Sequence, residues 1–159
     1  MHSLKKYLVD AREFNTPSYK ALVLGNPSAD MDSVVGAIAL SWFYGEGKPL
    51  KYSPVINCLR SEIKLRIEIM EHLNKLGMNE NFVNENILFI DDLLKTEDAT
   101  SNVESVGLVD FNELNKELES KLMPKVHYII DHHVDNNKYL ETVKEKEVKH
   151  IGSAVTLVA

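Results

Sequence analysis

The chain has 159 residues, of which 44% are hydrophobic and 26% are charged, and these proportions are typical of one domain with a proper core. Its formal net charge of −6 and its lack of a basic cluster argue against a nucleic acid polymer as partner. The sequence contains no run of about 18 apolar residues and no signal peptide pattern, so we expect no membrane partner and a cytoplasmic or organelle-matrix location.

The first part of the chain predicts an extension followed by a strand and a helix. Residues 1–18 are predicted to form an N-terminal helix or extension, ahead of one domain over residues 19–159. The apolar run YKALVLGN predicts a first strand that enters a turn at Asn26. The stretch MDSVVGAIALSWFYG predicts a helix over Met31–Gly45, which Gly45 and Gly47 bring to an end.

Two further strands and a long helix are predicted next. The run YSPVINCL predicts a second strand over Tyr52–Leu59, and its Cys58, the single cysteine, is expected to be buried and inert. A helix is predicted over Ser61–Met78, where Gly77 offers a C-cap. Its apolar residues recur at helical spacing: Ile63, Ile67, Met70, Leu73 and Leu76. The run ENILFIDD predicts a third strand over Glu85–Asp92.

The second half of the chain completes a pattern of strands that alternate with helices. Strands are predicted over Val103–Phe111 and Lys125–His133, with a polar helix over Asn112–Leu122 between them and a surface loop over Glu97–Asn102. Strands with apolar runs on both faces, joined by helices, are typical of a parallel sheet that is covered on both sides. The predicted fold is therefore α/β, a three-layer α/β/α domain with a mainly parallel five-stranded sheet.

Polar side chains follow most of these strands at their carboxyl ends, which a parallel sheet brings to one edge. They are Asn26, Asp30 and Asp32 after the first strand, Asp91 and Asp92 after the third, Asp110 after the fourth, and Asp131, His132 and His133 after the fifth. Carboxylate and imidazole ligands together suit Mn²⁺, Mg²⁺, Co²⁺ or Zn²⁺. Enough carboxylates are present for two ions that share a bridging aspartate, which suits phosphoryl hydrolysis.

Each of these residues also has an ordinary structural interpretation. An aspartate just before a helix serves as an N-cap, which would explain Asp30 or Asp32 alone. Loop, cap or turn positions would explain three more acids: Asp91, Asp92 and Asp110. The adjacent pair His132 and His133, directly after Asp131, has no structural purpose that simpler residues would not serve. Taken together, the group favours a functional site.

Three motifs carry a family resemblance. GNPSADMDS, LVDFN and IIDHH resemble, in order and spacing, the motifs of the DHH phosphoesterase family. Within that family the chain looks most like the eukaryotic-type exopolyphosphatases, which are related to Prune-type phosphodiesterases and family II inorganic pyrophosphatases. The resemblance extends from about Tyr19 to the end of the chain. It implies that residues 19–159 are the catalytic DHH domain, truncated at its C-terminal end.

The resemblance implies a set of metal ligands. Asp30 would bind one metal ion and Asp32 a second, Asp110 would bridge them, and His132 would bind the second. Asn26 is a weak or adjacent ligand, because exopolyphosphatases carry asparagine where pyrophosphatases carry histidine. The implied cofactors are two divalent ions, Mn²⁺ or Mg²⁺, with Co²⁺ as a further option.

The resemblance also implies catalytic residues and substrates. His133 would contact the scissile phosphate, Asp131 would orient the neighbouring imidazoles, and Arg60 is a candidate substrate-binding residue. The implied reaction is attack of a metal-activated water on polyphosphate ends, with release of orthophosphate. Inorganic pyrophosphate or small nucleotides are the alternative substrates within the family, and a non-catalytic metal- or anion-binding half-domain is the alternative outside it.

Two departures from the family pattern bear on activity. The family usually has histidine after the bridging aspartate, where this chain has Phe111. The C-terminal substrate domain of the family is absent from this chain, which ends in HIGSAVTLVA. We therefore expect these 159 residues alone to fold but to be poorly active, with an open acidic edge and a short helix at the C-terminus.

Overall fold

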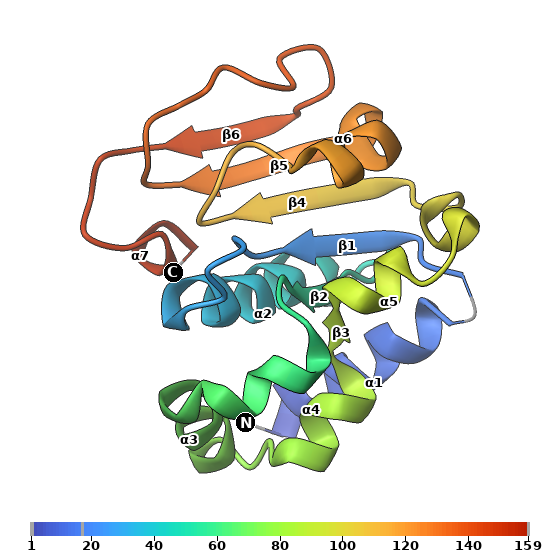
Figure 1. The fold of residues 1–159 in the computed structure, drawn as a ribbon, viewed down its shortest axis with the longest axis vertical. Helices are drawn as coiled ribbons and strands as arrows, with labels where there is room; N and C mark the ends of the chain where they lie inside the picture. The colour runs from blue at the N-terminus through green and yellow to red at the C-terminus, as the bar shows by residue number, and fades with distance from the viewer. Residues whose placement is uncertain (1, 17, 159) are drawn as a thin grey trace.

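A six-stranded parallel sheet forms the middle layer of the computed structural model, which describes residues 2–16 and 18–158 (Figure 1). The strands lie side by side in the order β3-β2-β1-β4-β5-β6, and every neighbouring pair is parallel. They span Ala21–Leu24 (β1), Ser53–Ile56 (β2), Leu88–Phe89 (β3), Ser105–Val109 (β4), Val126–Asp131 (β5) and Glu145–Val148 (β6).

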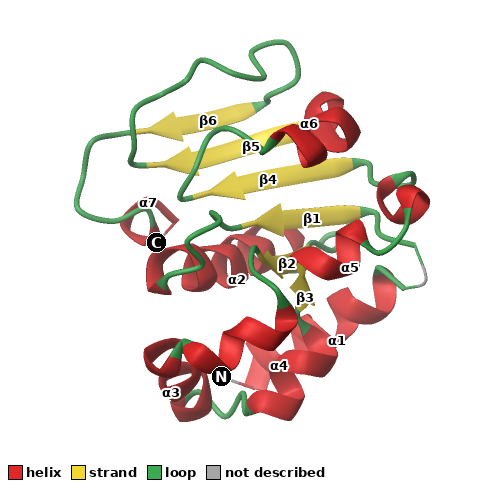
Figure 2. Cartoon of the chain, viewed as in Figure 1, coloured by secondary structure: helices red, strands yellow, loops and turns green. Residues whose placement is uncertain are grey.

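Helices cover both faces of this sheet (Figure 2). They span His2–Phe14 (α1), Met31–Gly45 (α2), Ile67–Lys75 (α3), Glu80–Asn86 (α4), Ile90–Leu94 (α5), Lys116–Leu122 (α6) and Val155–Val158 (α7). The residues of α2 and α7 pack with Val23 and Ile130 on one face, whereas those of α5 and α6 pack with Leu22 and Leu108 on the other. Successive residues of a strand therefore point to opposite faces of the sheet and pack against different helices.

The central strands are buried along their whole length. All residues of β1 and β4 are buried, which explains why their sequences are continuous apolar runs rather than alternating ones. Because β1, β4 and β5 are parallel neighbours, the residues after Leu24, Val109 and Asp131 lie at one edge of the sheet. This edge is where ligands bind in sheets of this kind.

The three-layer α/β/α prediction is confirmed, with one strand more than predicted. The sequence pattern does not predict β6, because its residues alternate acidic and basic side chains at an open edge instead of apolar ones. The predicted third strand is shortened to Leu88–Phe89, because Asp92 accepts a hydrogen bond from Phe89 N (2.9 Å) and so begins α5.

The long helix predicted over Ser61–Met78 is divided in the structure. A 3₁₀ helix spans Arg60–Leu65, and α3 begins only after Arg66, whose backbone is not helical. Gly77 has a φ of +76° just beyond α3, where the sequence predicts a C-cap. Cys58 is buried as expected, and burial raises the pKa of its thiol. Among the described residues, no helix is both long enough and apolar enough to cross a membrane.

Candidate functional site

Asp110 lies at the centre of the carboxyl edge of the sheet. It follows β4 directly, and its backbone N–H donates to Ile130 O of β5 (2.9 Å). Its φ of +66° is a left-handed conformation, which turns the chain sharply at the strand end and which aspartate adopts more readily than most residues. The residue is only 2% exposed, so its carboxylate is a buried charge that requires partners.

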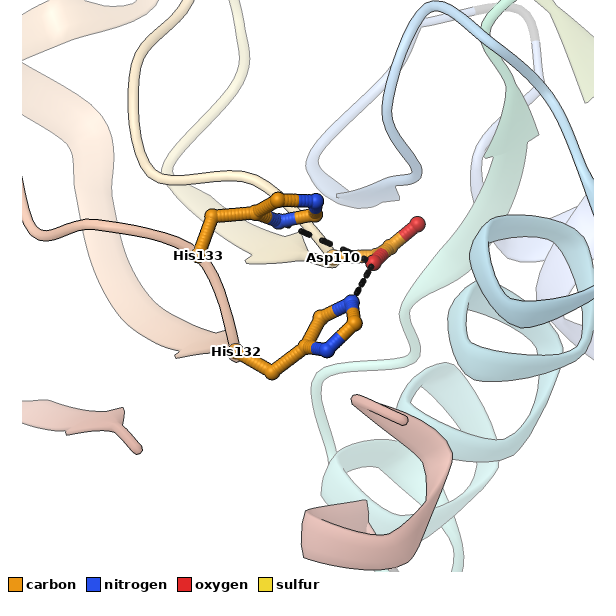
Figure 3. A group of neighbouring side chains, drawn as sticks. All are labelled: Asp110, His132 and His133. Atoms are coloured by element: carbon orange, nitrogen blue, oxygen red, sulfur yellow. Dashed lines mark hydrogen bonds and ion pairs between the residues drawn. The ribbon is translucent and has the colours of Figure 1, made fainter. Parts of the chain in front are cut away.

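Two histidines of the loop after β5 converge on Asp110 (Figure 3). His132 Nε2 lies 3.0 Å from Asp110 Oδ1, and His133 Nδ1 lies 3.9 Å from the same oxygen. The three side chains offer ligand atoms that all lie within 4.8 Å of one another. Their carboxylate oxygen and imidazole nitrogens form a group that could hold a metal ion, as the sequence predicts for Asp110 and His132.

The ring of His132 is held by a hydrogen bond at Nδ1. Nδ1 lies 2.9 Å from Ile151 O, a carbonyl that can only accept, so this nitrogen carries a proton. The bond to Ile151 and the charge of Asp110 raise the pKa of His132 above its ordinary value. In the neutral ring Nε2 is then the bare nitrogen, and it is the one that faces Asp110 and, at 3.7 Å, Asp32 Oδ2.

Asp30 and Asp32 stand at the start of α2. Asp30 is the N-cap of α2, because its Oδ1 accepts from Ser33 N (3.0 Å), so its ordinary interpretation is confirmed. Its other oxygen accepts from Ser28 Oγ (2.7 Å). The negative charges of Asp30 and Asp32 lie close enough to Asp110 to help raise its pKa.

Asp32 joins the start of α2 to the start of α7. Its carboxylate accepts from Ser153 Oγ (2.6 Å), Ala154 N (2.7 Å) and Val155 N (3.0 Å). Burial alone would raise the pKa of Asp32, but these three bonds outweigh it and hold the pKa below its usual range. Asp32 is therefore an ionised carboxylate whose Oδ2, bonded once, keeps a lone pair on the side of His132.

Asn26 contacts Asp110 through its amide nitrogen. Nδ2 donates to Asp110 Oδ2 and to Asp110 O (3.1 Å), while Oδ1 accepts from Ser28 N (2.7 Å). In this arrangement Asn26 is a hydrogen-bond partner of Asp110, because an amide nitrogen does not bind a cation. Its weak ligand role stays a prediction.

Asp131 lies behind the two histidines and is fully buried. Its Oδ1 accepts from His133 Nδ1 (2.7 Å) and from His132 N (2.8 Å). This geometry fits the predicted orienting role of Asp131, because the carboxylate fixes both the ring of His133 and the backbone that carries His132.

Arg60, Asp91 and Asp92 form a separate group between β2 and α5. The guanidinium of Arg60 donates to Asn84 O (2.6 Å), pairs with Asp92 and lies 4.4 Å from the ring centre of Phe89. Asp91 accepts from Arg60 N (3.2 Å). The two acids have the loop and cap roles of their ordinary interpretation, and the predicted substrate contact of Arg60 stays a prediction.

An open pocket of about 350 Å³ adjoins the group of Asp110 and His133. Apolar side chains on its wall include Pro27, Phe111 and Val134. Phe111, which stands where the family usually has histidine, also packs against the core under α6. Its side chain therefore supplies an apolar wall instead of a polar group next to Asp110.

The electrostatics of the group fit a divalent cation. Burial, with the charges of Asp30 and Asp32, raises the pKa of Asp110 to about 6, against the opposing effect of the two histidines. Three carboxylates that repel one another, beside an imidazole nitrogen, form a donor set that suits a divalent cation. A cation would remove the repulsion that favours protonation of Asp110.

The raised pKa of Asp110 predicts how pH changes the stability of the metal-free chain. The unfolded chain releases this proton near pH 4, whereas the folded chain keeps it up to about pH 6. The stabilisation is therefore full below about pH 4 and is lost as the pH rises through about 6, by up to about 3 kcal/mol. Urea unfolding of wild type and Asp110→Asn with a chelator present should show this loss in wild type only.

The difference between the two proteins isolates Asp110 from other groups. Asp32, whose pKa is lowered, contributes in the opposite direction: its stabilisation is present above its unfolded pKa and is lost as the pH falls. It does so in both proteins. Parallel stability curves for wild type and Asp110→Asn between about pH 4 and 6 would contradict the assignment.

Asn112 and Ser153 are among the residues of the site that the sequence analysis does not single out. Asn112 bonds to Asp131, and Ser153 bonds to Asp32. No short-range signal identifies them, because each lies far along the chain from its partner. Ser153 belongs to the Gly–Ser pair that opens α7, and Asn112 ends the LVDFN motif.

Comparison with known proteins gives consistent matches. The family model described as DHH family, N-terminal domain, matches residues 20–159. Exopolyphosphatase PRUNE1 of Homo sapiens is 30% identical over 139 residues, which are 86% of this chain and 29% of that protein. The Rattus norvegicus exopolyphosphatase PRUNE1 is 31% identical over 161 residues, 98% of this chain and 34% of that protein.

A provisionally named exopolyphosphatase of Schizosaccharomyces pombe is 28% identical over 157 residues, which are 98% of this chain and 39% of that protein. The chain therefore spans about a third of the length of the curated relatives it matches.

Proposed function

The chain belongs to the DHH family, and on this basis we propose that it acts in a metal-dependent phosphoanhydride hydrolase that releases orthophosphate from polyphosphate ends. The observation that carries the proposal is the convergence of Asp110, His132 and His133 at the carboxyl edge of the sheet, beside Asp30 and Asp32. The names of the relatives support polyphosphate as the substrate class.

In this proposal Asp30, Asp32, Asp110 and His132 hold two divalent cations, Mn²⁺ or Mg²⁺. Asp110 would be the shared ligand, as the family resemblance implies; its Oδ1 lies 3.0 Å from His132 Nε2, which itself lies 3.7 Å from Asp32 Oδ2. When bound, the cations would neutralise charge on the phosphates and lower the pKa of the attacking water. The cations would also offset the formal net charge of −6, because an acidic chain without them would repel a polyanionic substrate.

His133 has a different role in the proposal. Its side chain is 54% exposed, it lines the open pocket, and its Nδ1 is bonded to Asp131. Because Nδ1 donates to a carboxylate, Nε2 is the ring nitrogen left for the substrate. When both ring nitrogens carry a proton, the imidazole would donate the Nε2 proton to a phosphate oxygen or to the leaving group, while Nδ1 stays bonded to Asp131. A cytoplasmic location belongs to the same proposal and rests on the sequence alone.

A substrate panel tests the proposed function. Orthophosphate release is measured from long polyphosphate, tripolyphosphate and pyrophosphate with Mn²⁺ or Mg²⁺, and nucleotide products are followed from a small phosphodiester. We expect polyphosphate or tripolyphosphate to be cleaved at least about 10-fold faster than pyrophosphate, a difference of about 1.4 kcal/mol in transition-state binding. Asn26 motivates this order, because an amide replaces the imidazole of the pyrophosphatases.

The same panel distinguishes the alternatives. Asp110→Asn, prepared in parallel, controls for contaminating phosphatases. Faster cleavage of pyrophosphate or of the phosphodiester would assign the chain to a different substrate class of the family. Metal binding without cleavage of any substrate would favour the non-catalytic half-domain.

A further inference from the structure

Asn112 connects the two loops that carry the candidate site. It lies two residues after Asp110 and is only 4% exposed. Its amide nitrogen donates to Asp131 Oδ2 and to Val134 O (2.9 Å), and its oxygen accepts from Asn136 N (3.0 Å). The three bonds reach from the loop after β4 to Asp131 at the end of β5 and to the segment after β5, in which His133 stands.

Asp131 is the link between Asn112 and His133. Its Oδ2 accepts from Asn112, while its Oδ1 accepts from His133 Nδ1 (2.7 Å) and from the backbone of His132 (2.8 Å). The carboxylate is thus held at both oxygens inside the protein, where it is fully buried. Without Asn112, Oδ2 would be a buried acceptor that lacks this donor, and the carboxylate would be free to rotate away from His133.

We propose that Asn112 is a positioning residue that holds Asp131 and thereby keeps the ring of His133 protonated at Nδ1, with Nε2 free for the pocket. The consequence for turnover rests on the proposed function. The position of the ring proton of His133 does not depend on the proposed function, because it follows from the hydrogen bonds of Asn112 and Asp131 alone.

The side chain at position 112 must both donate and accept. Asp131 Oδ2 and Val134 O are acceptors, whereas Asn136 N is a donor, and an amide satisfies all three. The isosteric Asn112→Asp places an acceptor against two acceptors. Asn112→Ala removes every bond, and Asn112→Gln keeps the amide on a longer side chain.

Nuclear magnetic resonance of the metal-free chain tests the proposal directly. The ¹⁵N shifts of the His133 ring, recorded at about pH 8 where histidine is neutral, report which nitrogen carries the proton. We expect Nδ1–H in wild type, a shift toward Nε2–H in Asn112→Ala and Asn112→Asp, and partial recovery in Asn112→Gln. Asn115→Ala is the matched control, because it removes the N-cap of α6 in the same loop but no bond to Asp131.

Turnover supplies the second measurement. If Asn112 acts through His133, Asn112→Ala should lower kcat by about 10- to 100-fold, with KM and Mn²⁺ affinity changed by less than about 3-fold. The control Asn115→Ala should keep the wild-type kcat. If wild type releases no orthophosphate, the proposed function fails, whereas the ring measurement still decides the role of Asn112.

Two results would overturn the role of Asn112. One is a wild-type His133 ring protonated at Nε2, and the other is an Asn112→Ala ring that matches wild type. Should the variants fail to fold, hydrogen exchange of wild type decides the case. The side-chain amide protons of Asn112 are buried and hydrogen-bonded, whereas the side-chain amide of Asn136 makes an exposed hydrogen bond to Glu113. The Asn112 protons should therefore exchange more slowly with solvent than those of Asn136, and equal exchange rates would refute the proposal.

Discussion

Replacing Asp110 with asparagine should remove divalent-cation binding at both proposed positions, and with it the release of orthophosphate. The carboxylate faces His132 Nε2 at 3.0 Å on one oxygen and Asn26 on the other, and the charges of Asp30 and Asp32 act on it. A neutral amide there removes the charge that both cations would share. Since the loss of a group that merely supports a ligand costs about 10- to 100-fold in affinity, loss of the shared ligand should cost more than about 100-fold.

Asparagine is the suitable replacement for structural reasons. Asp110 has a φ of +66°, and asparagine tolerates this conformation, whereas alanine would be strained. The amide also fills the same space and removes a buried charge, so the variant should fold without metal. Loss of binding can then be attributed to the missing carboxylate.

Calorimetry with Mn²⁺ measures the effect. Wild type should show two sites, Asp110→Asn none, and Asp32→Asn one, because Asp32 is expected to serve a single ion. Asp98→Asn is the control for one lost negative charge, since Asp98 is exposed and lies in the short 3₁₀ helix Glu97–Thr100. One site of unchanged affinity in Asp110→Asn would contradict the bridging role.

The strands that carry this site can be predicted from the sequence, because buried strands consist of continuous apolar residues. β1 and β4 are buried on both faces, and continuous apolar runs predict such strands. Once the sheet is parallel, the position of Asp110 and His132 at one edge follows from topology rather than from any detail of packing. Sequence reasoning therefore locates the site more securely than it defines individual contacts.

The parts that sequence reasoning misses have little apolar content or depend on long-range contacts. β6 is an edge strand of alternating charges, and α4 is a short polar helix that begins at the N-cap Asn79. Asp92 shows how a polar contact cuts an apolar run short: it accepts a hydrogen bond from Phe89 N, so the strand ends at Phe89 and α5 begins at Ile90. Asn112 reaches Asp131 only because two loops meet in the folded chain.

The two histidines differ in which ring nitrogen lies nearest to Asp110. His132 has Nδ1 at the carbonyl of Ile151 and presents Nε2 to Asp110, which is the arrangement of a metal ligand held by an outer partner. The nitrogen of His133 nearest to Asp110 is Nδ1, and Asp131 already occupies it at 2.7 Å. In the proposed function His133 would therefore act on substrate through Nε2, and His132 would bind a cation through its own Nε2.

Replacing each histidine with asparagine should therefore produce different defects. His133→Asn keeps a donor for Asp131 but loses the imidazole, so kcat should fall by about 10²- to 10⁴-fold, the range of a general acid, while Mn²⁺ affinity changes by less than about 3-fold. His132→Asn should first weaken Mn²⁺ binding, by at least about 10-fold, and excess Mn²⁺ should restore part of its turnover.

Paired measurements of kcat and of Mn²⁺ affinity on both variants distinguish these roles. His127→Asn provides the control, because His127 lies near the start of β5, away from the carboxyl edge of the sheet, where its Nδ1 bonds Ser105 Oγ (2.9 Å). Excess Mn²⁺ cannot restore His133→Asn if that residue acts on the substrate, because the lost group is a proton donor rather than a ligand. Equal loss of Mn²⁺ affinity in both variants would instead make His133 a metal ligand, and the proton would then have to come from another group at this edge of the sheet.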